Sequence, residues 1–279
     1  MRGSVFDTRS SVSLSHSGDQ EDLEVERLVT HIITLHTELS SLPDLRPCDE
    51  INKLFQELVV LCTRTVGETV ASKKQVINNP RIISILPALR HICAAAECHL
   101  EFGSFSMLVE RPADHAVYDR LVKFPYFNNY VDLTRLELGA ISAVDTTPIR
   151  KIVFIGSGPL PMTSLQLTYI LSPDIEILNI DHDPLAISQS LTLCERLGIK
   201  GKGMEFLTQH EKEALLIDIV AKMRKGAILV VRSAHGLRRV LYAEFDPTTE
   251  AVKRCLDVQA VVHPYNHVVN SLIVGKVRN

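Results

Sequence analysis

The sequence predicts an α/β protein, in which an N-terminal all-α domain precedes a mostly parallel sheet with helices on both faces. Apolar residues recur at helical spacing through the first half of the chain. In the second half, short apolar strands alternate with helices, which is typical of βαβ units and a parallel sheet. The change falls at Thr147-Pro148, so the predicted domains are residues 21–147 and 148–279.

The first domain is predicted from helix periodicity and helix-breaking prolines. Residues 1–20 are rich in Ser, Gly and charge and have little to bury, so we expect a disordered tail. An apolar face runs from Glu21 to Leu39, and Pro43 and Pro47 end that helix. Further helices are predicted over residues 51–62, 80–102 and the second half of 124–141.

The second domain is predicted from six short apolar runs. The expected strands are KIVFIG, IEILNI, GMEFL, AILVVRS and two within LDVQAVVHPYNHVVNSLIVGKV, with helices LQLTYIL, PLAISQSLTLCERLG and EKEALLIDIVAKMR between the earlier ones. The last two strands should form a hairpin that adds an antiparallel edge strand.

Composition restricts the class of protein. The 279 residues are 46% hydrophobic and 23% charged with a net charge of −3, so no nucleic-acid or membrane partner is expected. No signal-peptide pattern opens the chain. The six cysteines form no CxxC pair or metal-finger spacing, which favours reduced thiols in a soluble cytoplasmic protein. The histidines form no HxH pair, and we expect no catalytic metal.

A glycine turn is the strongest local signal for a ligand site. Gly156, Ser157 and Gly158 follow directly on an apolar strand, where glycine lets the backbone approach a ligand closely. Asp181 ends the next strand 25 residues after Gly156, the position from which a carboxylate binds a ribose diol. An ordinary strand-to-helix turn is the alternative. The missing third glycine favours S-adenosylmethionine over a dinucleotide.

Two glutamates and two tyrosines in the helical half form a second candidate group. Glu97 and Glu101 are four residues apart and share one face of a predicted helix. Tyr126 and Tyr130 lie in FPYFNNY and combine aromatic bulk with hydrogen-bonding tips. A solvated glutamate pair and interface packing of the tyrosines are the alternatives.

Arg232 and His235 form a third candidate group. They follow the strand AILVV, and ligands of open α/β sheets bind at the carboxyl ends of such strands. Simple covering of the sheet edge explains them equally well.

Several of these segments together resemble the nicotianamine synthase family over nearly the whole chain after residue 20. The segments that carry the resemblance are SSLPDLRPCDEINKLFQELVVLC, ICAAAECHLE, FPYFNNYVDLTRLEL, FIGSGPLPMTS, NIDHD, RSAHGLRRVLY and HPYNHVVNS. The resemblance implies a helical domain followed by a class I methyltransferase-like, or Rossmann-like, domain.

The resemblance also implies a reaction and its residues. Three molecules of S-adenosylmethionine, used as the substrate, would donate aminocarboxypropyl groups to give nicotianamine and methylthioadenosine, without a metal. An attacking amine must lose a proton to a base. The family places that glutamate in AECHLE and an orienting tyrosine in FPYFNNY. We expect Glu97 and Tyr126 in these roles, with Glu101 and Tyr130 second and as substrate ligands beside Arg232 and His235.

The chain departs from the family pattern after Leu207. About 20 to 25 residues are absent there, which in the family form a helix and a fourth strand beside the glycine-turn strand. Because unpaired buried backbone groups are costly, we expect the strand KIVFIG to pair with AILVV instead.

Two other functions fit the sequence. A methyltransferase of small amines would use the same glycine turn and Asp181. A shortened, non-catalytic member of the family would keep the fold without the pocket. The oligomeric state is left open by the sequence.

Overall fold

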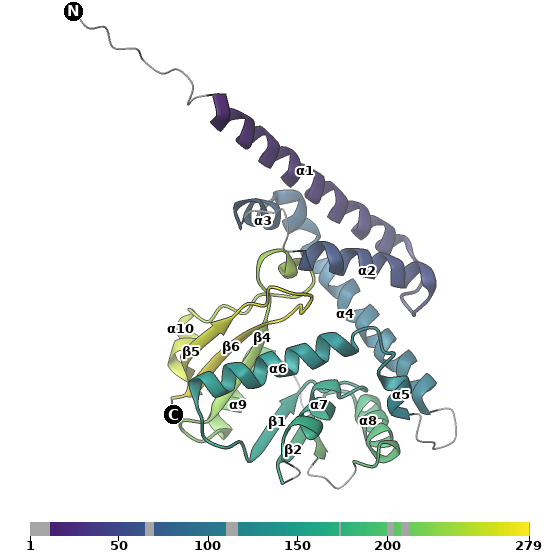
Figure 1. Ribbon diagram of the computed structural model, residues 1–279, viewed down its shortest axis with the longest axis vertical. Helices are drawn as coiled ribbons and strands as arrows, with labels where there is room; N and C mark the ends of the chain where they lie inside the picture. The colour runs from purple at the N-terminus through teal and green to yellow at the C-terminus, as the bar shows by residue number, and fades with distance from the viewer. Residues whose placement is uncertain are drawn as a thin grey trace, which may run out of the picture.

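The chain folds into a helical end and two small sheets. The computed structural model describes residues 12–64, 70–109, 117–172, 174–199, 204–207 and 212–278. Helices α1, α2 and α3 lie at one end of the molecule, α4 runs from that end to α5, and α6 crosses in front of the two sheets (Figure 1).

Every element described before Lys151 is a helix. Their bounds are α1 Val12–Ser41, α2 Asp49–Thr63, α3 Val70–Ile77, α4 Pro80–Val109, α5 Val117–Leu121 and α6 Phe127–Val144. Helices α3 and α5 were not predicted. The expected disordered tail is wrong for residues 12–20, which belong to α1, while residues 1–11 lie outside the described part.

The helical end is held together by the faces that the sequence pattern predicts. Helix α1 packs against α2, α3 and α4. Ile32 and Leu39 of α1, Leu58 of α2 and Leu89 of α4 are almost completely shielded from solvent in one cluster. Each such side chain stabilises the fold by ~1.5–3 kcal/mol relative to leaving it exposed.

Helix α4 is apolar enough to raise the question of a membrane. It contains an 18-residue window of mean hydropathy 1.2, so it could cross a membrane by length and composition alone. Core helices of soluble proteins pass the same test. Helix α4 packs against α1 and α8 and carries Glu97 and Glu101 in its second half.

The second half forms two sheets rather than one. Strands β1 Lys151–Ile155, β2 Glu176–Ile180 and β3 Met204–Leu207 make a parallel sheet in the order β1-β2-β3. Strands β4 Ile228–Ser233, β5 Leu256–Val262 and β6 Ser271–Val277 make an antiparallel sheet in the order β4-β6-β5. The remaining elements are α7 Met162–Ile170, α8 Pro184–Arg196, α9 Lys212–Lys222, the 3₁₀ helix η1 Gly236–Val240 and α10 Glu250–Cys255.

The predicted pairing of the glycine-turn strand with AILVV is wrong. Among the described residues, β1 pairs only with β2, and β4 pairs only with β6. Helix α6 contacts both α7 and the antiparallel sheet, so it packs across both parts of this half of the chain. The Arg232 guanidinium of β4 lies 4.9 Å from the ring centroid of Phe154 in β1, which connects the sheets through side chains instead of backbone.

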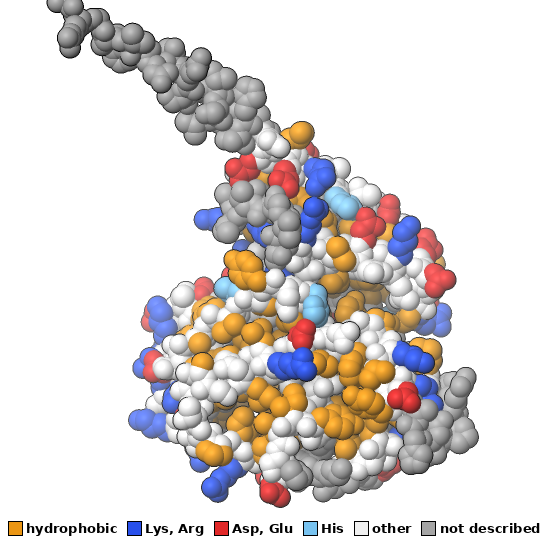
Figure 2. Space-filling view, in the orientation of Figure 1, with side chains coloured by type: hydrophobic (Ala, Val, Ile, Leu, Met, Phe, Trp, Pro, Cys, Tyr) orange, Lys and Arg blue, Asp and Glu red, His pale blue; other side chains and the backbone are white. Residues whose placement is uncertain are grey.

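Strand β1 is consequently less buried than predicted. Lys151 and Val153 are exposed, Val153 to 47%, and the other residues of β1 are only partly buried. Hydrophobic side chains gather on the face of the molecule that carries α6 and the parallel sheet (Figure 2). The predicted terminal hairpin is confirmed: β5 and β6 pair antiparallel, β6 lies beside β4, and β5 is the antiparallel edge strand.

Candidate active site

The glycine turn after β1 is locked onto the end of β2. The backbone N–H groups of Gly156 and Ser157 donate to the Ile180 carbonyl at 2.7 and 3.2 Å. Gly156 and Gly158 have φ angles of +77° and +68°, a backbone conformation that favours glycine. The sequence therefore folds locally into the tight turn that the motif predicts.

Asp181 holds this turn from the other side. One carboxylate oxygen accepts from Gly158 N at 2.8 Å, and the second accepts from Asp183 N at 3.0 Å. The Asp181 side chain is buried. Because a carboxylate has about four lone-pair positions, both oxygens retain capacity to accept further hydrogen bonds.

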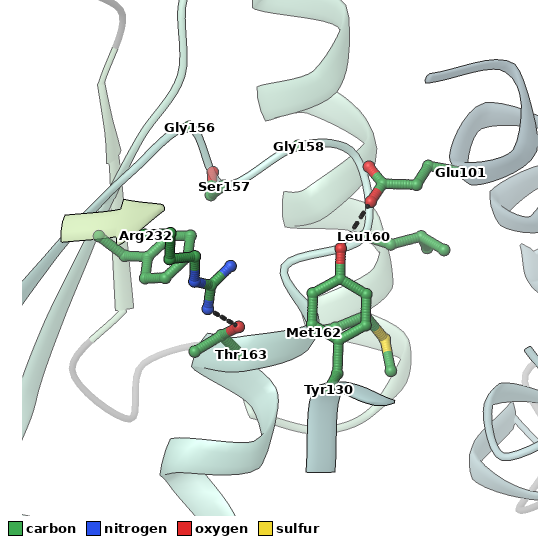
Figure 3. A pocket seen from close by; sticks show the side chains of 10 residues that line it. Glu101, Tyr130, Gly156, Ser157, Gly158, Leu160, Met162, Thr163 and Arg232 are labelled. Atoms are coloured by element: carbon green, nitrogen blue, oxygen red, sulfur yellow. Dashed lines mark hydrogen bonds between the residues drawn. The ribbon is translucent and has the colours of Figure 1, made fainter. Parts of the chain in front are cut away.

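The turn borders a small pocket of about 50 Å³, or about 260 Å³ when the open space at its mouth is included. It is lined by Glu101, Tyr130, Phe154, Gly156, Ser157, Gly158, Leu160, Met162, Thr163 and Arg232. Glu101 and Arg232 lie on opposite sides of it, with Ser157 between them along the turn (Figure 3). The pocket therefore has a carboxyl group on one wall and a guanidinium group on the facing wall.

Two features of the pocket indicate space prepared for a ligand. The Ser157 hydroxyl is buried and has no hydrogen-bond partner among the described residues. A Cβ added at Gly156 would meet nothing within 4 Å. Buried polar groups without partners are rare in native proteins, so the hydroxyl is suited to a ligand group.

Glu101 is the carboxylate that touches the glycine turn. Its Oε1 accepts from the Tyr130 hydroxyl at 3.2 Å. Its Oε2 lies so near Gly158 that a Cβ there would approach it to 2.5 Å, which places the carboxyl group against the turn. Burial raises the pKa of Glu101 to about 8, and the charges of Glu97 and Asp181 act in the same direction. A carboxyl group with this pKa is well suited to exchange protons near neutral pH.

Glu97 lies one helical turn before Glu101 and has a different partner. Its Oε2 accepts from the Tyr242 hydroxyl at 2.6 Å, across 145 residues of sequence. Burial raises the pKa of Tyr126 to about 12, with a further contribution from the charge of Glu97. Glu97, Tyr126 and Tyr242 thus form a second group that adjoins the pocket.

Arg232 is fixed by three neighbours. Its Nε donates to Glu137 Oε1 at 2.8 Å, its Nη2 donates to Thr163 Oγ1 at 2.7 Å, and its guanidinium lies over Phe154. Burial opposes the charge on Arg232, but the Glu137 carboxylate outweighs it and raises the pKa of Arg232. The guanidinium is therefore a permanent positive charge in the pocket wall.

His235 lies outside the pocket. Its ring stacks on His263 with centroids 4.2 Å apart, and its Nδ1 is 2.8 Å from the Ser271 hydroxyl. Burial lowers the pKa of His235 to about 4. His263 and His267 have the i, i+4 spacing of some metal sites but lie in the loop before β6. Within the described residues no group of three or more potential metal ligands is found.

The pocket contains some of the predicted site residues and not others. Those that line it are Gly156, Ser157, Gly158, Glu101, Tyr130 and Arg232; Glu97, Tyr126, Asp181 and His235 do not. Sequence reasoning missed Thr163, whose place at the start of α7 directly after the turn could have indicated it. It also missed Tyr242, for which no local signal exists.

The fold and the site define a class of protein. A glycine turn at the carboxyl end of a parallel strand, a buried acid ending the next strand and a small polar pocket belong to α/β proteins that bind a nucleoside-type ligand. The profile described as "Nicotianamine synthase protein" matches residues 20–210 and 207–279. The chain therefore belongs to the nicotianamine synthase family.

Plant relatives support this membership. Nicotianamine synthase 1 of Oryza sativa subsp. indica is 34% identical over 288 aligned positions, covering 92% of this chain and 83% of that protein. Nicotianamine synthase 9 of Hordeum vulgare is 33% identical over 283 positions, covering 91% and 80%.

Solved structures support the fold. A glutamine variant of MtNAS in complex with S-adenosylmethionine superimposes with a TM-score of 0.73 at 18% identity, covering 90% of this chain and 98% of that one. MtNAS in complex with MTA and tNA gives a TM-score of 0.72 at 17% identity, covering 92% and 97%.

The comparisons also bear on the predicted deletion. The family profile matches in two parts that meet at residues 207–210, between β3 and α9. The rice alignment has 288 positions, more than the 279 residues of the whole chain, so the relative has residues without a counterpart here. A missing segment after Leu207 is consistent with both findings.

Proposed function

We propose that this chain is a nicotianamine synthase, a transferase that moves aminocarboxypropyl groups from three S-adenosylmethionine molecules in turn. Family membership supports the activity, and the glycine turn supports a class I methyltransferase-like arrangement of the donor site. The single observation that carries the proposal is the pocket itself, which is lined by Glu101 beside Gly158 and by Ser157, whose buried hydroxyl has no hydrogen-bond partner among the described residues.

The charges of the pocket suit this substrate. S-adenosylmethionine carries a positive sulfonium, an ammonium and a carboxylate. Glu101 provides carboxyl oxygens that can accept hydrogen bonds from an ammonium, and the Arg232 guanidinium provides a positive charge for a carboxylate. Asp181 remains the proposed ribose ligand, because its carboxylate can accept beyond its two backbone partners.

The transfer needs a neutral amine. Its nitrogen attacks the carbon that joins the aminocarboxypropyl chain to sulfur, the carbon–sulfur electron pair passes to the sulfur, and methylthioadenosine leaves. Of the two candidate bases, contact with the turn favours Glu101, with Tyr130 as the orienting hydroxyl. Glu97 and Tyr126 lie one step further from the turn.

Product analysis tests this function. The purified chain is incubated with S-adenosylmethionine alone, and the nucleoside products are separated. Methylthioadenosine together with nicotianamine supports the proposal, whereas S-adenosylhomocysteine indicates methyl transfer. A zero-enzyme control corrects for spontaneous breakdown of the donor.

One observation favours a second candidate, a family member that no longer turns over. The unpaired edge of β1 leaves the strand before the glycine turn half exposed. Isothermal titration with S-adenosylmethionine separates the two: binding with product supports the enzyme, and the absence of both supports the non-catalytic form.

A further inference from the structure

Two carboxylate–tyrosine pairs lie side by side on α4. Glu101 accepts from Tyr130 at 3.2 Å, and Glu97, one turn earlier, accepts from Tyr242 at 2.6 Å. Residues four apart on a helix lie on the same face. The two carboxylates are therefore neighbours, each with its own phenol.

Tyr242 is held in place by the segment that follows β4. The Arg90 guanidinium of α4 donates to the Arg239 carbonyl from Nε at 2.9 Å and from Nη2 at 2.6 Å. The buried Arg238 donates to the backbone carbonyls of Val268 and Asn266. Because this segment is anchored to both α4 and the loop before β6, the Tyr242 hydroxyl has a defined position at Glu97.

We propose that Tyr242 is a positioning residue, which holds Glu97 as an ionised carboxylate one helical turn from Glu101 and thereby makes Glu101 a stronger proton acceptor for the attacking amine. This inference rests on the proposed function. In this proposal, Glu97 supplies a negative charge beside Glu101. Tyr242 affects Glu101 only through its hydrogen bond to Glu97.

The physical basis is hydrogen bonding to a charged group combined with like-charge repulsion. A hydroxyl that donates to a carboxylate favours its ionised form. A negative charge nearby makes a second carboxylate harder to ionise, so the neighbour binds a proton more tightly.

Other groups also lie within electrostatic reach of Glu97. Those that interact with it electrostatically are Cys93, Cys98, Tyr126, Tyr130 and Arg232. The first four are neutral when protonated. Arg232 is positive but is already paired with Glu137, so Tyr242 provides the direct donor.

A double-mutant cycle tests the proposal. The variants are Tyr242→Phe, Glu97→Gln and the two combined, with Tyr169→Phe as the control. Tyr169 is 51% exposed on α7 and makes an edge-on contact with Tyr118, so its hydroxyl is remote from the acids. The readouts are the pKa of Glu101 from carbon NMR of its carboxyl group, kcat and the KM for S-adenosylmethionine.

The expected pattern separates this role from a structural one. Glu97→Gln lowers the pKa of Glu101 by about one unit, the scale of a charge one helical turn away in a partly buried site. Tyr242→Phe lowers it less and reduces kcat several-fold with little change in KM. In the Glu97→Gln background, Tyr242→Phe has no further effect on either quantity.

Three results overturn the proposal. The first is an unchanged pKa of Glu101 in Glu97→Gln. The second is an equal effect of Tyr242→Phe with and without Glu97, which indicates a packing role. The third is a similar effect of Tyr169→Phe. The NMR titration of Glu101 does not require turnover. A chain that released no methylthioadenosine would therefore refute the proposed function, but the effect of Glu97 and Tyr242 on the pKa of Glu101 could still be measured.

Discussion

Restoring the missing segment tests whether the open edges of β1 and β4 lower the stability and the activity of this shortened chain. The change is insertion, after Leu207, of the corresponding residues of the rice relative. Both edges lack a backbone partner among the described residues, and a side-chain contact between Arg232 of β4 and Phe154 of β1 connects the two strands. A strand between them would pair on both sides.

The magnitude follows from the exposure of these strands. Val153 is 47% exposed, and the apolar residues of β4 are only partly buried. Covering these side chains should raise the free energy of unfolding by ~0.5–1 kcal/mol for each side chain, or about 3 kcal/mol together. We take the burial of the inserted strand's own side chains to offset the entropy lost when that strand becomes ordered. At ~2–4 °C per kcal/mol, the melting temperature should rise by about 6–12 °C.

The assay compares thermal unfolding and methylthioadenosine release of the natural chain, the restored chain and a control with a Gly-Ser insert of the same length. We expect the restored chain to be more stable and more active, since the strand also excludes water from the donor pocket. Equal melting temperature and activity in all three proteins would mean that two sheets are the complete fold and that the alignment of this region is wrong.

The remaining predictions concern the pocket. Glu101→Gln should reduce turnover by at least ~10²-fold and leave S-adenosylmethionine binding intact. Normal turnover would mean that Glu101 is not the base and would favour Glu97 instead. Asp181→Ala should weaken binding of S-adenosylmethionine by ~1.5–3 kcal/mol in titration, whereas Asp183→Ala, which removes an N-cap of α8, should lower only stability. Arg232→Lys should destabilise the chain by ~1–3 kcal/mol in denaturant unfolding, because an ammonium cannot serve Glu137 and Thr163 together. The pKa of Glu101 is raised from 4.5 to about 8, so the stability it contributes is complete below pH 4.5 and lost as the pH rises to 8; Glu101→Gln should flatten unfolding free energy over this window.

The local motifs were readable because they depend on residues adjacent in the chain. The glycine turn formed where the sequence predicted it, since Gly156 and Gly158 adopt backbone angles that other residues avoid. The apolar faces of α1, α2 and α4 and all six strands were likewise visible as periodic patterns. The short helices α3 and α5 were missed because segments of eight and five residues carry too little periodicity.

The pairing of the sheets could not be read from the sequence. The rule that buried backbone groups must be paired predicted contact between β1 and β4, but it does not apply where the edge stays partly exposed. Which glutamate faces the turn was also undecided, because Glu97 and Glu101 share one helix face and have the same local context.

The sequence by itself determined the family, the long helices, the six strands and the position of the glycine turn, because each of these depends on residues that lie close together in the chain. Only the tertiary structure decided that Glu101 touches the turn, that Tyr242 bonds to Glu97 across 145 residues, and that Arg232 bonds to Glu137 across 95. These contacts depend on how the helices and the two sheets pack against one another. Local sequence patterns do not predict which side chains meet when the residues lie so far apart in the chain.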